Sequence, residues 1–107
     1  MVGTTTDTDG LAERVIAALR AHEAELRAAG IAGLSLFGSV ARGDAEADSD
    51  VDLAARLDPD ARVGLFALGA LEGRLSELVG RRVDLLPEPV EEARLQANID
   101  RDRRRAF

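Results

Sequence analysis

The spacing of apolar residues along the chain predicts three amphipathic helices. In each of three segments, apolar side chains recur every three or four residues and so share one helical face. The first segment is residues 11–29. The second is residues 65–79, with Leu65 as the first residue of its apolar face. The third begins near Pro89 and loses its apolar pattern within residues 101–105. Asp9 is the expected N-cap of the first helix, and Gly30 and Gly80 stand where the first two helices should end. The turn signal at residues 58–60 is expected to start the second helix.

Short apolar runs between these helices predict three strands. The runs are residues 34–37, 51–57 and 82–86, the last terminated by Pro87. About a dozen residues join the first two strands, too few for a crossover helix, so antiparallel pairing is expected there. The third strand follows a helix and is expected to run parallel to the second. The fold class is therefore α/β, with a single small mixed sheet packed with helices.

The connection between the first two strands is expected to hold one helical turn at residues 39–43 and an acidic loop at residues 44–49. Residues 1–8 are expected to form a flexible tail, and residues 9–107 a single domain.

The amino-acid composition limits the kinds of metal site that this domain can form. The chain has no cysteine and one histidine, His22, which excludes thiolate sites and makes a zinc site implausible. We expect the His22 side chain to be packed against the protein or to expose only its tip to solvent. A metal would therefore be held by carboxylates, which points to magnesium or manganese. The net charge of −6 argues against general binding of nucleic acid.

No apolar run is long enough to cross a membrane, and the N-terminus has no signal-peptide pattern. We therefore expect a cytoplasmic protein with no membrane partner.

The residues that point to chemistry lie around the first two strands. Gly38 and Ser39 follow a strand and open a helical turn, an arrangement that cradles phosphate oxygens. Asp50 and Asp52 are two apart on a strand, so their carboxylates share one face, where a divalent cation would relieve their repulsion. Asp84 is a third carboxylate inside an apolar strand and can complete the cluster if the two strands are neighbours. Such a set favours metal-assisted phosphoryl or nucleotidyl transfer.

These motifs resemble those of a known family. The sequence GSVARG at residues 38–43, followed by SDVDL at residues 49–53, looks like the signature of the minimal nucleotidyltransferases of the polymerase-beta superfamily. The resemblance covers nearly the whole chain and is strongest to the MNT antitoxins that pair with HEPN ribonuclease toxins. It implies that Gly38 and Ser39 bind the triphosphate, that Asp50 and Asp52 hold the metals, and that Asp84 is the third ligand and the base.

The family also implies the reaction. AMP would pass from ATP onto a hydroxyl of a HEPN-type toxin, typically of a tyrosine, with Mg²⁺ or Mn²⁺ as cofactor. The chain departs from many relatives at its end, which carries arginines and Phe107 where those relatives have a glycine-containing, tyrosine-ended segment.

Two further residues are weaker candidates for nucleotide binding. Arg42 is expected either to contact phosphate or to form an ion pair with Asp48 or another acid of the loop. Ser49 is expected to shape its turn rather than to take part in chemistry. The arginines of residues 101–105 are expected to form a solvated end, with binding of a partner as the alternative.

Three functions are compatible with these residues. The first is an antitoxin that adenylylates its toxin, the second is an antitoxin that neutralises by binding alone, and the third is a small-molecule transferase of the aminoglycoside type. An intact set of three acids favours catalysis over binding alone. The small size of the domain favours a protein acceptor.

Overall fold

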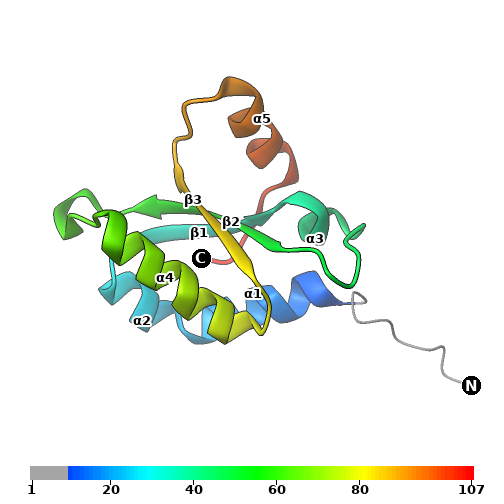
Figure 1. Cartoon of the computed structure of the whole chain (residues 1–107), viewed down its shortest axis with the longest axis horizontal. Coiled ribbons are helices and arrows are strands. Elements are labelled where there is room, and N and C mark those ends of the chain that lie inside the picture. The colour runs from blue at the N-terminus through cyan, green and yellow to red at the C-terminus, as the bar shows by residue number, and fades with distance from the viewer. Residues whose placement is uncertain (1–9) are drawn as a thin grey trace, which may run out of the picture.

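A computed structural model describes residues 10–107 as a four-stranded mixed sheet with helices on both faces (Figure 1). The helices are α1 (Leu11–Ala21), α2 (Glu23–Ala28), α3 (Gly38–Arg42), α4 (Leu65–Val79) and α5 (Ala93–Asp102), and the strands are β1 (Ile31–Phe37), β2 (Val51–Leu57), β3 (Val83–Glu88) and β4 (Arg104–Arg105). The predicted fold class is confirmed. No helix in this part of the chain has the length and apolar character needed to span a membrane.

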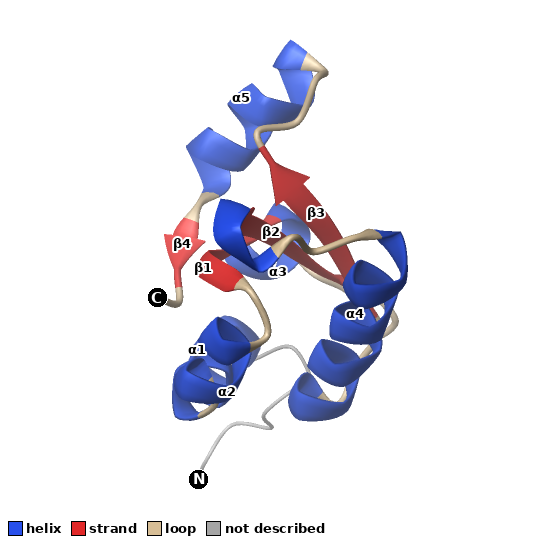
Figure 2. Cartoon of the chain, turned by 90° about the vertical axis from the view of Figure 1, so that its left-hand side faces the viewer, coloured by secondary structure: helices blue, strands red, loops and turns tan. Residues whose placement is uncertain are grey.

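The sheet has the strand order β3-β2-β1-β4. β1 and β2 are antiparallel and β2 and β3 are parallel, as predicted. The sequence pattern did not predict β4, which pairs antiparallel with β1 through Ser35 and Arg105 (Figure 2).

The two faces of the sheet carry cores of different size. α1, α2 and α4 cover one face, where Val51, Leu53 and Ala55 belong to the larger core (Figure 2). α5 covers the other face, where its fully buried Ile99 packs in a small cluster with Ala54. Successive side chains of a strand point to opposite faces. Asp52 therefore faces the α5 side, next to Ala54.

The first predicted helix is interrupted. His22, with φ −112° and ψ 19°, separates α1 from α2, and its side chain is half exposed, as expected. Leu19 on one side of the break and Leu26 on the other are both fully buried, so the apolar spacing continues across the interruption and hides it. Gly10 is the N-cap of α1, whereas the expected cap, Asp9, lies outside the described residues. Gly30 follows α2 with φ 111°, in agreement with its predicted role.

Two strands are longer than predicted. β1 starts at Ile31, and β3 continues through Pro87 to Glu88, so the prediction that Pro87 ends the strand was wrong. β3 is an edge strand, and a proline without an N–H is tolerated at a sheet edge because no neighbour needs its hydrogen bond.

The second predicted helix begins later than expected and buries fewer residues. A short 3₁₀ turn, Pro59–Ala61, occupies the expected start, where the Asp58 carboxylate accepts a hydrogen bond of 2.9 Å from the Asp60 N–H. α4 itself begins at Leu65. The side chains of Leu65 and Phe66 are 83% and 95% exposed, so Leu65 does not belong to the buried stripe.

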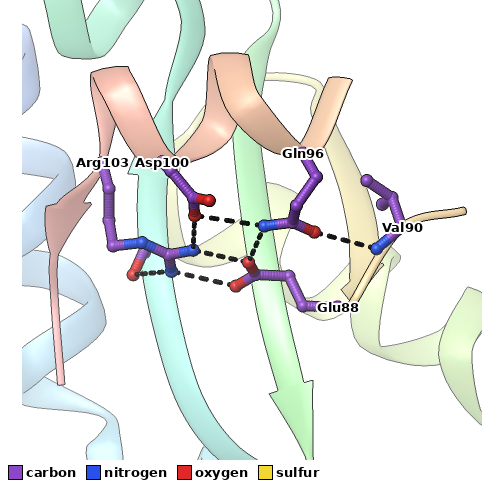
Figure 3. A network of polar contacts seen from close by, with 6 residues as sticks. Glu88, Val90, Gln96, Asp100 and Arg103 are labelled. Atoms are coloured by element: carbon purple, nitrogen blue, oxygen red, sulfur yellow. Dashed lines mark hydrogen bonds and ion pairs between the residues drawn. The ribbon is translucent and has the colours of Figure 1, made fainter. Parts of the chain in front are cut away.

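The prediction of a solvated arginine-rich end is correct for Arg101 and Arg105, which are exposed, but not for the segment as a whole. Figure 3 shows Arg103 bridging to Glu88 of β3 and to Asp100 of α5. Gln96 donates to the same Glu88 carboxylate at 2.8 Å and accepts from the Val90 N–H at 2.9 Å (Figure 3). This network fastens α5 to the edge of the sheet.

The rest of the C-terminal segment is also anchored. Arg104 forms an ion pair with Glu13 of α1, and Ala106 and Phe107 are buried.

Leu75 and Leu65 lie on the same helix at opposite extremes of burial, and together they test the core. We expect Leu75→Ala to lower the free energy of unfolding by about 2–5 kcal/mol, because it leaves a cavity against the sheet. Leu65→Ala should change it by less than about 0.5 kcal/mol, because its side chain already lies in water. Urea unfolding followed by circular dichroism measures both values. Equal losses in the two variants would contradict the burial described here.

The Glu88–Arg103 contact predicts a specific dependence of stability on pH. Hydrogen bonds from Arg103 lower the pKa of Glu88, and burial partly opposes them. The stabilisation is therefore complete above the ordinary pKa of a glutamate and is lost as the pH falls through the lower folded-state pKa. At pH 7 we expect Glu88→Gln to be less stable than the unaltered chain by roughly 1–2 kcal/mol. The difference should shrink toward zero in acid.

Glu91→Gln is the matched control, because Glu91 is exposed and makes no ion pair within residues 10–107. It should have no effect at either pH. Melting temperatures measured from pH 7 to pH 3 give the comparison, and a Glu88→Gln difference that persists at pH 3 would argue against the ion pair as its cause.

Candidate functional site

Three carboxylates gather at the edge of the sheet where β2 and β3 begin. In the parallel register of these strands, Asp52 is directly opposite Asp84. Neighbouring strands lie about 4.8 Å apart, and opposed residues share a face. Asp50 lies two residues before Asp52 and exerts a coulombic effect on it. The expectation that the second and third strands are neighbours is confirmed, and their register brings Asp84 beside Asp52.

Asp52 is partly buried where β2 begins. Burial raises its pKa, and the neighbouring charges of Asp84 and Asp50 raise it further. Arg42 has a smaller, opposing effect. Negative charges are therefore crowded where β2 and β3 begin, and this crowding favours binding of a cation between the carboxylates.

Asp84 differs from its neighbours in being exposed. It lies on an edge strand between the buried Val83 and Leu85 but is itself open to solvent, and the nearby Arg82 does not pair with it. Arg82 instead has its Nε 3.7 Å from Asp50 Oδ1, and no ion pair to Asp84 occurs within residues 10–107. Asp84 is therefore accessible to a molecule that approaches this edge.

Gly38, at the end of β1, lies in close contact with Asp52. Its φ is +76°, in the region that favours glycine. A Cβ added there would lie 2.2 Å from Asp52 Oδ2, closer than any non-bonded atoms can approach. The sequence motif suggested that the missing side chain lets a phosphate approach. The structure adds that its absence makes room for the Asp52 carboxylate.

Ser39 follows Gly38 in the short helix α3. Its carbonyl accepts hydrogen bonds of 3.0 Å from the N–H groups of Gly43 and Asp44, which close the turn. Its side chain is partly exposed, and its hydroxyl has no protein partner among the described residues. A free hydroxyl therefore lies next in the chain to the glycine that contacts Asp52.

Arg42 is engaged in ion pairs within the protein. Its Nε lies 3.2 Å from Asp44 of the acidic loop, as one of the two interpretations expected, although not from Asp48. Its Nη1 donates to Asp102 of α5 at 2.8 Å. The Asp102 side chain is 5% exposed and also accepts from Arg101. Sequence reasoning missed Asp102, because nothing in a linear pattern links residues 60 positions apart.

Ser49 shapes the loop before β2, as predicted. Its hydroxyl accepts a hydrogen bond of 2.8 Å from the Glu46 N–H, and its carbonyl accepts one of 3.0 Å from Arg81. These contacts set the path of the chain into Asp50.

The three carboxylates are chemically suited to bind a divalent metal ion, although their side chains are not arranged around a single binding position. Carboxylate oxygens on one sheet face are the ligands that Mg²⁺ and Mn²⁺ prefer. Within residues 10–107 no three His, Cys, Asp or Glu side chains are gathered tightly enough to hold an ion as they stand. Repulsion between uncompensated carboxylates acts to keep them apart.

Comparison with known proteins agrees with this geometry. Residues 19–107 match the family model described as nucleotidyltransferase domain. A protein named protein adenylyltransferase MntA, from Thermococcus cleftensis, is 40% identical over 75 residues, which are 69% of this chain and 74% of the relative.

Solved structures share the fold. A chain assigned as a minimal nucleotidyltransferase superposes with a TM-score of 0.69 at 31% identity, over 95% of this chain and 98% of that one. A chain in the structure of the tri-AMPylated Shewanella oneidensis HEPN toxin in complex with an MNT antitoxin has a TM-score of 0.62 at 17% identity, over 86% of this chain and 71% of that chain. The match to the family model, the identity to MntA and the carboxylates at the sheet edge lead to one assignment. The chain belongs to the nucleotidyltransferase domain family, as a minimal nucleotidyltransferase.

Proposed function

We propose that this chain transfers AMP from ATP to a tyrosine hydroxyl of a HEPN-type toxin and thereby acts as its antitoxin. The relative at 40% identity is named a protein adenylyltransferase, and the HEPN toxin in the Shewanella structure carries AMP and is bound to an MNT antitoxin. The observation that carries the proposal is the gathering of acidic charge where β2 and β3 begin, with Asp52 opposite Asp84, Asp50 two residues before Asp52, and Gly38 against the Asp52 carboxylate.

The roles follow from the position of each residue. The three carboxylates, of Asp50, Asp52 and Asp84, would hold Mg²⁺ or Mn²⁺. The metal would neutralise negative charge on the triphosphate. Gly38 and Ser39 bind the triphosphate, with the Ser39 hydroxyl as a hydrogen-bond donor. Arg42 holds α3 against α5 through Asp102 and contributes positive charge beside Asp52.

In this proposal Asp84 has the role of base toward the acceptor hydroxyl. Because it is exposed, it can accept the proton of an incoming hydroxyl without displacing protein. The hydroxyl oxygen then forms a bond to the α-phosphorus, the bond from that phosphorus to the bridging oxygen of the β-phosphate breaks, and pyrophosphate leaves. The proton lost by the hydroxyl remains on Asp84 until water removes it.

The Asp84→Asn variant tests this role. We expect transfer of labelled AMP to the toxin to fall about 10²- to 10⁴-fold, because the acceptor hydroxyl loses the group that deprotonates and aligns it. ATP binding should remain largely intact, since Asp50 and Asp52 are still present. The melting temperature should not fall, because Asp84 is exposed and breaks no ion pair when altered.

Asp48→Asn is the matched control, as it removes the same charge from an exposed loop position nearby. Normal transfer by a folded Asp84→Asn variant would sink the assignment. A folded variant that binds ATP, transfers nothing and still neutralises the toxin would instead favour neutralisation by binding.

Gly38→Ala tests the contact between the glycine turn and Asp52. The new methyl group must push the Asp52 carboxylate away, so we expect transfer to fall at least 10²-fold and ATP binding to weaken. Gly43→Ala is a close control: Gly43 also has positive φ, +84°, but nothing lies within 4 Å of the added methyl group. Both variants should lose about 1–2 kcal/mol of unfolding free energy from backbone strain. Only Gly38→Ala should lose activity in the folded protein, and equal activities would refute the proposed contact.

A further inference from the structure

A cavity of about 360 Å³ lies on the α5 face of the sheet, at the end away from the carboxylates. Its place follows from the strand register, in which Arg56 is opposite Gly33 on one side and Glu88 on the other. Arg56 is four residues beyond Asp52 on β2, so both lie on the same face. At about 3.3 Å per residue, the two positions are roughly 13 Å apart.

Two arginines of this cavity have no partner in the protein. Within residues 10–107 the side chains of Arg56 and Arg105 make no ion pair, hydrogen bond or ring contact. The third, Arg103, is neutralised by Glu88. The guanidinium of Arg56 lies across Gly33, where an added Cβ would stand only 3.2 Å from its Nη2. Glycine at this position therefore leaves room for the arginine on the floor of the cavity.

The chemistry of the cavity suits a carboxylate. Unpaired guanidinium groups bind carboxylates through paired hydrogen bonds. Leu34, Pro89 and Phe107 supply apolar wall beside the arginines, which matches the short aliphatic stem of an aspartate or glutamate.

A nucleic-acid strand fits this face less well than an acidic protein segment. The cavity also contains Glu88, and the face continues toward Asp52 and Asp84. A polyanion laid along it would meet these acids on a chain whose net charge is −6. A single carboxylate on an otherwise mixed surface avoids that repulsion.

We propose that this cavity binds an aspartate or glutamate side chain on the surface of the protein acceptor, as a second contact that orients the acceptor on the α5 face. The role in orienting the acceptor rests on the proposed function, because it presumes transfer to a protein. The binding of a carboxylate does not, because it follows from the two unpaired arginines alone.

Binding is tested directly on the full chain with a defined probe. The probe is acetyl-Leu-Glu-Glu-Leu-amide, compared with the same peptide carrying glutamine, and it is titrated against ¹⁵N-labelled protein. We expect the glutamate peptide to shift the backbone amides of Gly33 and Ser35. In the variant Arg56→Gln plus Arg105→Gln its dissociation constant should rise about tenfold or more.

The control variant is Arg62→Gln plus Arg94→Gln. It removes two arginines that are also exposed and without a partner in the described chain but lie outside the cavity. Binding in the control should change less than about twofold. If the double cavity variant fails to fold, the single substitutions Arg56→Gln and Arg105→Gln are each measured instead.

The second arm measures AMP transfer to the protein acceptor. The cavity variant should raise the KM for the acceptor about tenfold and leave kcat and the KM for ATP unchanged, whereas loss of a merely structural residue would lower the folded fraction. An unchanged KM for the acceptor would overturn the orienting role.

The peptide titration tests whether the cavity binds a carboxylate, whether or not the unaltered chain transfers AMP. A failure to transfer AMP would count against the proposed function alone. Equal binding of the glutamate and glutamine peptides would overturn the proposal. So would cavity-dependent binding of an octauridylate in place of the peptide.

Discussion

The end of the sheet where β2 and β3 begin is organised around the repulsion between Asp52 and Asp84. The parallel register of β2 and β3 places these two acids opposite one another, and Asp50 adds a third negative charge. The Asp52 carboxylate occupies the space that a side chain at residue 38 would fill, which Gly38 leaves open. Burial raises the pKa of Asp52, and the charges of Asp84 and Asp50 raise it further. Such an edge favours binding of a cation, and this requirement suits a transferase that handles a nucleoside triphosphate.

α5 and the segment that follows it connect this edge to the rest of the molecule. Asp102, at the end of α5, binds Arg42 of the glycine-serine turn, while Arg103 binds Glu88 on β3. β4 then pairs with β1, the strand that leads directly into Gly38. The arginine-rich end is therefore part of the framework that positions the site. The Arg105 side chain, by contrast, has no partner within residues 10–107 and lines the cavity on the same face.

Much of the fold was readable from local pattern. The short apolar run at residues 51–57 predicted the bounds of β2, and the leucines of α4 predicted its end at Gly80. The short connection between β1 and β2 was enough to predict antiparallel pairing. The errors have a common cause: the break at His22, the exposure of Leu65, the continuation of β3 through Pro87 and the pairing of β4 all depend on what neighbours a segment in space. An apolar residue at helical spacing is buried only if another element covers it.

The sequence by itself determined the chemical content of this protein: the glycine-serine turn, the pair of acids two residues apart, and the absence of thiol ligands. These are properties of side chains and of spacing within one element, so local rules suffice. Only the tertiary structure decided that Asp84 lies opposite Asp52, that Asp102 holds Arg42, and that Arg56 and Arg105 share a cavity without partners. Each of these relations joins residues from distant parts of the chain. Strand register and helix docking create them, and both are outcomes of packing the whole domain.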